Sequence, residues 1–173
     1  PTRRSSDLIP VAPPEAVAPV NVNQLLREVL ELDKQRLLAG GMIVDWKPTP
    51  ILPAVTARVS RLRSMFKHLI DNALDAMEGN RHDPRELRIA TSIRDEAVIV
   101  IIEDTGPGVP AELRWQIFEP FFTTKRAATH VGLGLALVQE VVNEQRGVIS
   151  IDPDYVAGCR WRISLPLRYD DDS

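Results

Sequence analysis

An apolar stripe in residues 58–78 constrains the fold more than any other pattern in this sequence. Its members recur at steps of three and four residues, the spacing of one helical face; they are Leu62, Met65, Phe66, Leu69, Ile70, Ala73, Leu74 and Met77. The stripe predicts a long helix packed on a core. His68, Asn72 and Asp75 share a neighbouring stripe that borders the apolar one, so we expect their side chains to line the edge of a cleft.

Weaker patterns predict the remaining elements. Asn21 or Asn23 can cap a helix that runs to about Ala39, and Gly40-Gly41 ends it. Further segments have strand or helix character: strands over 42–46 and 51–55 around a turn, an antiparallel pair over 87–93 and 97–103, a short helix near 111–117, a loop over 118–131, a helix over 132–145, and strands over 148–151 and 160–165. This mixture indicates an α+β fold, a two-layer sandwich with one sheet covered by helices on one face.

Composition excludes several classes of protein. The 173 residues, 44% hydrophobic and 26% charged, suit one globular domain. A net charge of −3 gives no electrostatic case for nucleic acid, and the single Cys159 excludes a disulfide framework or a cysteine-based zinc site. The longest aliphatic run, Ala97–Ile102, is too short to cross a bilayer. We expect a cytoplasmic domain that itself contacts no membrane, whether or not the full-length protein is anchored in one.

The two ends differ from the middle of the chain. Five of the 14 prolines lie in residues 1–19, so residues 1–20 are predicted to be an extended linker, whose first eight residues are interpreted as a non-native start. Residues 21–168 are predicted to form the domain. Residues 169–173 are predicted to be a solvated acidic tail.

An acid followed by glycines comes directly after the apolar strand 97–103. A tight turn accounts for Gly106, Pro107 and Gly108, but not for an acid at the end of a buried strand. The carboxylate of Asp104 could accept a hydrogen bond from an exocyclic amine such as that of adenine. Asn72 offers a neutral amide oxygen, a suitable ligand for Mg²⁺ that keeps its phosphates and waters.

A second glycine pair opens the helix over 132–145. Gly132 and Gly134 each cost a helix about 1 kcal/mol relative to Ala, which either close packing or phosphate binding at the helix N-terminus would explain. Lys125 in the preceding segment supplies positive charge. That segment also holds three of the four phenylalanines within residues 118–122, which is typical of a lid or of a contact with another protein.

In their order along the chain, these segments resemble the N, G1, F and G2 boxes of the ATP-binding domain of sensor histidine kinases. That family belongs to a superfamily shared with gyrase, the Hsp90 chaperones and the MutL repair ATPases. The matching segments are NALDAM (72–77), DTGPG (104–108), FEPFFTTK (118–125) and GLGLALV (132–138). The resemblance extends from about Val20 to Pro166 and implies a Bergerat-type ATP-binding fold with a mixed, mostly antiparallel sheet.

The resemblance also implies roles for individual residues. Asn72 would chelate Mg²⁺, Asp104 would hold the adenine amine of ATP or ADP, and the segment from Phe118 to Val131 would be the lid. His68 and Asn72 are the implied catalytic residues. The remaining implied nucleotide contacts are Asp75, Gly106, Gly108, Phe118, Thr124, Lys125, Gly132, Leu133, Gly134 and Leu135.

In this family the γ-phosphoryl group passes to a histidine on a separate dimerisation domain, and the signal reaches a response regulator. None of the three histidines, His68, His82 and His130, heads the long amphipathic hairpin that a phosphoacceptor requires. We therefore expect that this chain alone does not phosphorylate itself.

Two positions depart from the family pattern. His68 stands where sensor kinases usually carry Asn and the ATPase branches carry a Glu base, so a gyrase-like hydrolase is disfavoured. His130 stands where the lid usually has Gly. These departures leave an alternative open: a NifL-like nucleotide-sensing domain that regulates a transcriptional activator by binding it, without kinase activity.

Overall fold

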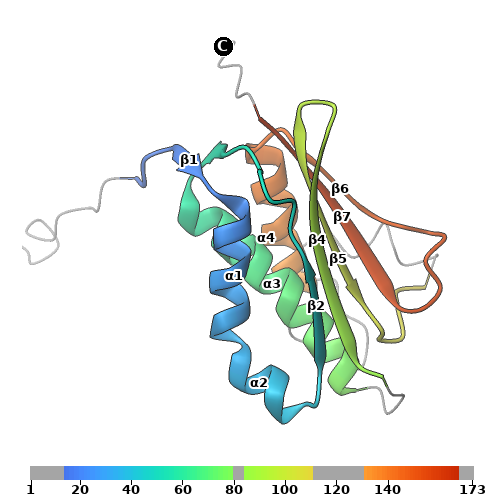
Figure 1. Cartoon of the computed structure of the whole chain (residues 1–173). Helices are drawn as coiled ribbons and strands as arrows, with labels where there is room; N and C mark the ends of the chain where they lie inside the picture. The colour runs from blue at the N-terminus through green and yellow to red at the C-terminus, as the bar shows by residue number, and fades with distance from the viewer. Residues whose placement is uncertain (1–13, 80–83, 111–130, 168–173) are drawn as a thin grey trace, which may run out of the picture.

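A computed structural model describes residues 14–79, 84–110 and 131–167, with the backbone alone for 131–134 (Figure 1). The described elements in chain order are β1 (Ala18–Val20), α1 (Val22–Leu32), α2 (Lys34–Ala39), β2 (Ile43–Lys47), β3 (Val55–Ala57), α3 (Val59–Glu78), β4 (Glu86–Arg94), β5 (Ala97–Asp104), α4 (Val131–Glu144), β6 (Val148–Ile151) and β7 (Cys159–Pro166).

A five-stranded sheet forms one layer, and α1, α3 and α4 lie together on one of its faces (Figure 1). The strand order is β2-β4-β5-β7-β6, and every neighbouring pair is antiparallel except the parallel pair of β2 and β4. The predicted two-layer α+β sandwich with a mostly antiparallel sheet is confirmed.

The predicted long helix is α3, and its apolar stripe is the centre of the core. All eight stripe residues are buried, and seven are fully enclosed. They pack against the inward residues of β4, β5 and β7, which alternate with outward ones as the pleat of a half-buried sheet requires. The hairpin of β4 and β5 also forms as predicted, with Asp95 and Glu96 both at positive φ in its two-residue turn.

The first helix is capped as predicted but is broken. Asn21 is the N-cap of α1, since its side chain accepts a hydrogen bond from Gln24 N at 3.1 Å. The helix ends at Leu32, and α2 begins after Asp33, whose buried carboxylate accepts a hydrogen bond from Lys67 of α3 at 2.8 Å. Gly40 and Gly41 then end α2, with Gly41 at φ +60°.

The predicted strand over 51–55 is wrong in position and in pairing. The strand is β3, over 55–57, and it pairs with β1 in a separate two-stranded sheet rather than forming a hairpin with β2. The segment after β2 is held at Thr49, whose amide donates to Thr91 Oγ1 at 2.9 Å and whose carbonyl accepts from Asn23 at 2.9 Å. Those bonds direct the chain from the edge of the sheet to the helices, where β3 pairs with β1.

The linker predicted over residues 1–20 extends too far, because its last residues belong to a strand. Ala18–Val20 form β1, and Val20 is buried. Ahead of β1, Glu15 binds the first turn of α3: its carboxylate accepts a hydrogen bond from Ser60 N at 3.1 Å, and its carbonyl accepts one from Arg58 Nε at 2.9 Å. These contacts make residues 15–20 part of the folded domain. The start at residues 1–8 and the acidic tail lie outside the described residues.

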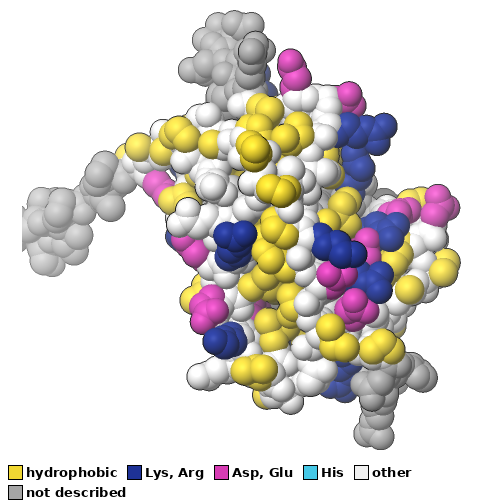
Figure 2. Space-filling model, in the orientation of Figure 1, with side chains coloured by type: hydrophobic (Ala, Val, Ile, Leu, Met, Phe, Trp, Pro, Cys, Tyr) yellow, Lys and Arg dark blue, Asp and Glu magenta, His cyan; other side chains and the backbone are white. Residues whose placement is uncertain are grey.

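None of the helices within the described ranges is long and apolar enough to cross a bilayer. Figure 2 shows hydrophobic side chains in a band over the seam between α1 and the edge strand β2, with charged groups on both sides. Ile43 and Val44 of β2 are among the exposed apolar residues.

Candidate functional site

Asp104 ends β5 on the face of the sheet that the helices cover. Its Cα pairs across the sheet with those of Leu87 and Cys159, and its side chain is only 3% exposed. Gly106 N donates a hydrogen bond to Asp104 Oδ1 at 2.8 Å. Burial raises the pKa of Asp104 to about 6. Hydrogen bonds from the backbone amides of Gly106 and Cys159 lower the pKa, but by less than burial raises it. These amides use only part of its acceptor capacity, so the carboxylate can bind a further donor.

The turn after Asp104 is pressed between α3 and the loop that leads into β7. A Cβ on Gly106 would lie 2.9 Å from Ala76 Cβ and 3.0 Å from Asp104 Oδ1. Gly108 has φ +76°, and a Cβ there would lie 2.7 Å from the carbonyl oxygen of Gly158. Both predicted glycines are thus needed for close approach, and Gly108 also for its backbone conformation.

Asn72 lies on the face of α3 that turns toward α4. It follows Arg61 by eleven residues, which is three helical turns, so the two side chains share a face. Arg61 pairs with Glu144 and Glu140 of α4, the latter at 3.0 Å. Asn72 Nδ2 is buried and has no hydrogen-bond partner among the described residues. Its amide is therefore not committed to a structural bond within them.

The beginning of α4 lies at about the level of Asn72. The pairing of Arg61, near the start of α3, with the end of α4 shows that the two helices run antiparallel (Figure 1). From the pair of Arg61 and Glu144, ten residues back along α4 and ten residues forward along α3 each cover about 15 Å in the same direction. That step brings the backbone of residues 132–134 to about the level of Asn72.

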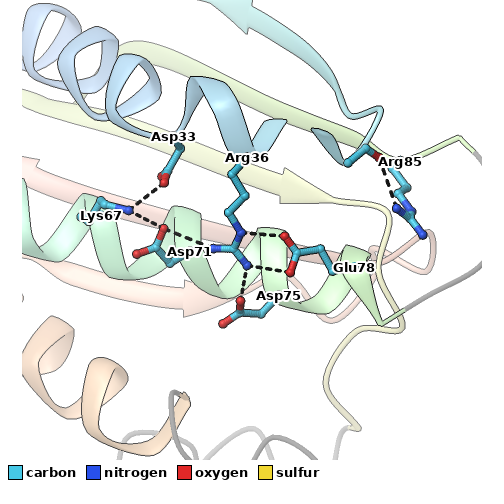
Figure 3. A network of polar contacts seen from close by, with 8 residues as sticks. Asp33, Arg36, Lys67, Asp71, Asp75, Glu78 and Arg85 are labelled. Atoms are coloured by element: carbon cyan, nitrogen blue, oxygen red, sulfur yellow. Dashed lines mark hydrogen bonds and ion pairs between the residues drawn. The ribbon is translucent and has the colours of Figure 1, made fainter. Parts of the chain in front are cut away.

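The other predicted site residues differ in their surroundings. His68 is partly buried on the face of α3 that carries Asn72. Asp75 is engaged from the other side, by an ion pair with Arg36 of α2 (Figure 3). Leu135 is 1% exposed, and its side chain belongs to the core. Asp75 and Leu135 thus have structural partners besides any nucleotide.

The rest of the predicted site cannot be placed. Phe118, Thr124 and Lys125 lie outside the described residues, as do His82 and His130. The predicted helix near 111–117 falls in the same gap, and so does the predicted loop over 118–131 except for its last residue, Val131, which is already in α4. For Leu133, only the backbone position in the first turn of α4 is described.

Three site residues were not found from the sequence. Ala76 lies one turn after Asn72 and touches Gly106. Gly158 lies so close to Asp104 that a Cβ would be 1.9 Å from the aspartate carbonyl oxygen. Tyr155 Oη donates to that same oxygen at 3.4 Å. The glycine just before the last predicted strand was the available signal, since Gly at a strand start marks close backbone approach.

The described residues offer few ligands for a metal ion, which fits a cation that is also bound by a nucleotide and by water. Within residues 14–79, 84–110 and 131–167, no group of three or more His, Cys, Asp or Glu side chains is arranged to hold a metal ion. The uncommitted amide of Asn72 could supply one oxygen. Phosphate oxygens and water would have to supply the rest, which is how Mg²⁺ is usually held with nucleotides.

A hollow of about 170 Å³ elsewhere on the molecule is separate from this arrangement. It lies on the open face of the sheet and is lined by Arg88, Glu103 and Arg160, among others. Glu103 and Arg160 are paired with each other there at 2.7 Å. Since Glu103 and Asp104 point to opposite faces, the hollow lies behind the candidate site.

Comparison with known proteins shows the family to which the chain belongs. Residues 57–169 match the family model described as histidine kinase-, DNA gyrase B-, and HSP90-like ATPase. The sensory histidine kinase/phosphatase NtrB of Rhizobium leguminosarum bv. phaseoli is 34% identical over 166 residues, which cover 88% of this chain and 42% of that protein.

Solved structures share the fold. Full-length ShkA in complex with AMPPNP superposes with a TM-score of 0.76 at 29% identity, over 90% of this chain and 32% of that one. The catalytic domain of histidine kinase ThkA superposes with a TM-score of 0.75 at 25% identity, over 88% of this chain and 97% of that domain. The chain spans less than half the length of NtrB and of ShkA. None of these findings favours the NifL-like alternative.

Proposed function

This chain belongs to the histidine kinase-, DNA gyrase B- and HSP90-like ATPases and is the ATP-binding catalytic domain of a sensor histidine kinase, and from that premise we propose how its residues work. ATP binds where the end of β5, the C-terminal half of α3 and the beginning of α4 meet. Asp104 accepts a hydrogen bond from the adenine amine, and Gly106 and Gly108 let the base approach the backbone.

The phosphates lie at the first turn of α4 in this proposal. The amides of Gly132 to Leu135 face the anionic groups, and the helix dipole favours negative charge there. Asn72 would supply an oxygen to Mg²⁺, whose charge would offset that of the phosphates. Phe118, Thr124 and Lys125 complete the site from the segment before α4. Asp75 keeps its ion pair with Arg36, and His68 borders the phosphate side of the cleft.

The reaction is transfer of the γ-phosphoryl group to a histidine of a separate dimerisation domain, with a response regulator as the later partner. Phosphoryl transfer needs little covalent chemistry from the protein, so Asn72 and the α4 amides act by positioning and charge stabilisation. The single observation that carries the proposal is Asp104, a buried carboxylate with unused acceptor capacity beside two glycines that admit no side chain.

Calorimetric titration of the chain with ATP tests the adenine assignment. Asp104→Asn should weaken ATP binding about tenfold to a hundredfold, because a charge-assisted hydrogen bond in a buried site is lost. Glu103→Gln is the matched control, since its side chain lies on the opposite face of the sheet, and it should leave the affinity unchanged. Equal affinity of the wild-type chain and Asp104→Asn would show that the adenine assignment is wrong.

A second measurement tests the transfer. A dimerisation domain that bears a phosphoacceptor histidine is mixed with this chain and ATP labelled in the γ-phosphate, with and without Mg²⁺. The label should appear on the added domain only when Mg²⁺ is present, and Asn72→Ala should abolish it. Tight ATP binding without any transfer to cognate acceptor domains would contradict the kinase proposal.

A further inference from the structure

Three carboxylates form one stripe on the C-terminal half of α3. Asp71, Asp75 and Glu78 are spaced by four and three residues, so they are neighbours on one helical face. Like charges at this spacing repel each other, and negative charge is unfavourable at the end of a helix, where the carbonyl groups point outward. Without compensation, this half of α3 would lose helical stability.

Arg36 of α2 reaches all three carboxylates (Figure 3). Its guanidinium bonds Glu78 twice, from Nε at 2.6 Å and from a terminal nitrogen at 3.0 Å. It also pairs with Asp75 and, at 3.6 Å, with Asp71. The contact with Glu78 is the main reason that the pKa of Arg36 is raised and that the pKa of Glu78 is lowered.

The helix that carries Arg36 is itself firmly held. Leu37 is buried, and its carbonyl oxygen accepts a hydrogen bond from Met42 N at 3.0 Å. Asp33, at the break before α2, is bound by Lys67 of α3 at 2.8 Å, and the same Lys67 binds Asp71 at 2.6 Å. Arg36 is thus a guanidinium on a rigid support rather than a flexible surface group.

The same stretch of α3 forms a wall of the proposed nucleotide site on its other side. Asn72 lies on the face toward α4, within the span of the acidic stripe. Ala76 touches Gly106, and Met77 Sδ accepts a hydrogen bond from Thr105 Oγ1 at 3.6 Å. Fraying or rotation of the last two turns of α3 would displace the Asn72 amide and open the contact with the Asp104 turn.

We propose that Arg36 is a positioning residue for the nucleotide site: by offsetting the repulsion within the acidic stripe, it holds the C-terminal half of α3 so that Asn72 meets the Mg²⁺ of the bound nucleotide. This inference rests on the proposed function, because it assumes that Asn72 is the Mg²⁺ ligand. In this proposal Asp75 acts through its ion pair with Arg36 of α2 and not through a contact with the nucleotide.

The test measures the dissociation constant of ATP by calorimetry with excess Mg²⁺ and again with EDTA. The ratio of the two constants isolates the gain from Mg²⁺. Arg36→Gln should reduce this gain about threefold to tenfold, because only the fraction of molecules with a correctly placed Asn72 contributes to it. A merely structural loss leaves the ratio intact, since unfolded molecules bind ATP in neither buffer.

Two further variants make the test specific. Arg63→Gln removes a similar pair between α3 and α1, with Glu28 at 3.2 Å, and should leave the gain from Mg²⁺ unchanged. Glu78→Gln in the Arg36→Gln background removes one of the repelling charges and should restore much of the gain. That rescue would not occur if Arg36 acted by contacting the nucleotide.

Three outcomes would overturn the inference. An unchanged gain in Arg36→Gln, with a normal gain in the wild type, would refute the role of Arg36 alone. Failure of Glu78→Gln to rescue a lost gain would refute repulsion within the stripe as the cause. A wild-type chain that binds ATP with no gain from Mg²⁺ would refute the role of Asn72 and, with it, that of Arg36.

Discussion

Asp104 is the residue on which the proposed adenine contact depends. A carboxyl group at 3% exposure is costly in its charged form, and its pKa of about 6 expresses that cost. The folded state therefore holds the proton more tightly than the unfolded chain does. The cost of ionising Asp104 appears as the pH rises from about 4 to about 6 and is fully present above that, where a hydrogen-bond donor on a ligand can offset it.

The pH dependence of adenosine binding follows from this shift. Adenosine is chosen because it carries no titrating phosphate. Its affinity should be constant above about pH 7 and fall on acidification, by about tenfold at pH 5, since the carboxylate must first lose its proton. Titration of the wild-type chain and of Asp104→Asn across pH 5–8 checks this. A flat profile for the wild type, or an equal slope in Asp104→Asn, would show that Asp104 does not control adenine binding.

At the scale of elements, the site depends on how closely β5 approaches α3. The two are joined through the turn at Gly106, which rests on Ala76, and through Thr105, whose Oγ1 lies 3.6 Å from Met77 Sδ of α3. Neither helix nor strand contains the site alone. Asn72 and Asp104 are 32 positions apart in the sequence, and the proposed site can include both because a glycine allows their elements to touch.

Gly106→Ala tests this contact. The added Cβ would lie 2.9 Å from Ala76 Cβ, so α3 and the turn must move apart. We expect a loss of about 1–3 kcal/mol in the free energy of unfolding, together with weaker ATP binding. Gly79→Ala is the matched control, because its Cβ would meet only carbonyl oxygens at 3.7 and 3.9 Å at an ordinary φ of −74°.

Chemical denaturation of both variants and calorimetry with ATP provide the measurements. Gly79→Ala should be neutral or stabilising by up to about 1 kcal/mol. If Gly106→Ala proved as stable as Gly79→Ala and bound ATP normally, the close packing of the turn on α3 would not matter for the site.

At the scale of the whole molecule, the described N-terminal residues belong to the domain. β1 pairs with β3, so Val20 is buried against the same core as α1 and α3. Glu15 places a carboxylate at the N-terminus of α3, where the helix dipole favours it, and hydrogen bonds from Ser60 lower the pKa of Glu15. The long helix is therefore held at both ends, by Glu15 at its start and by Arg36 near its end.

Two truncations test this boundary. A chain that starts at residue 14 keeps every described contact and should unfold at the same temperature as the full chain. A chain that starts at residue 21 loses β1 and the burial of Val20, and its free energy of unfolding should fall by about 2 kcal/mol. Thermal and chemical unfolding of the three chains measures the difference. If the chain from residue 21 were as stable as the full chain, residues 14–20 would belong to the linker, as the sequence predicted.

The sequence determined what depends on local chemistry. The three- and four-residue period of 58–78 predicted α3 to within one residue, because a helix buries one stripe whatever it packs against. The alternation and turn of 87–103 predicted the hairpin of β4 and β5, since its strands are adjacent in the chain. The order of the motifs identified the family and, through the resemblance, the residues expected in the site near Asp104 and Asn72.

Only the tertiary structure decided the pairings between distant segments. It placed β2 parallel to β4 and β3 beside β1, choices that depend on Thr49, Thr91 and Asn23 meeting across the fold. It also brought Gly158 onto Asp104 and Arg36 onto the acidic stripe of α3. Contacts of this kind have no local signal, because their free energy arises only when two separate elements are already packed together.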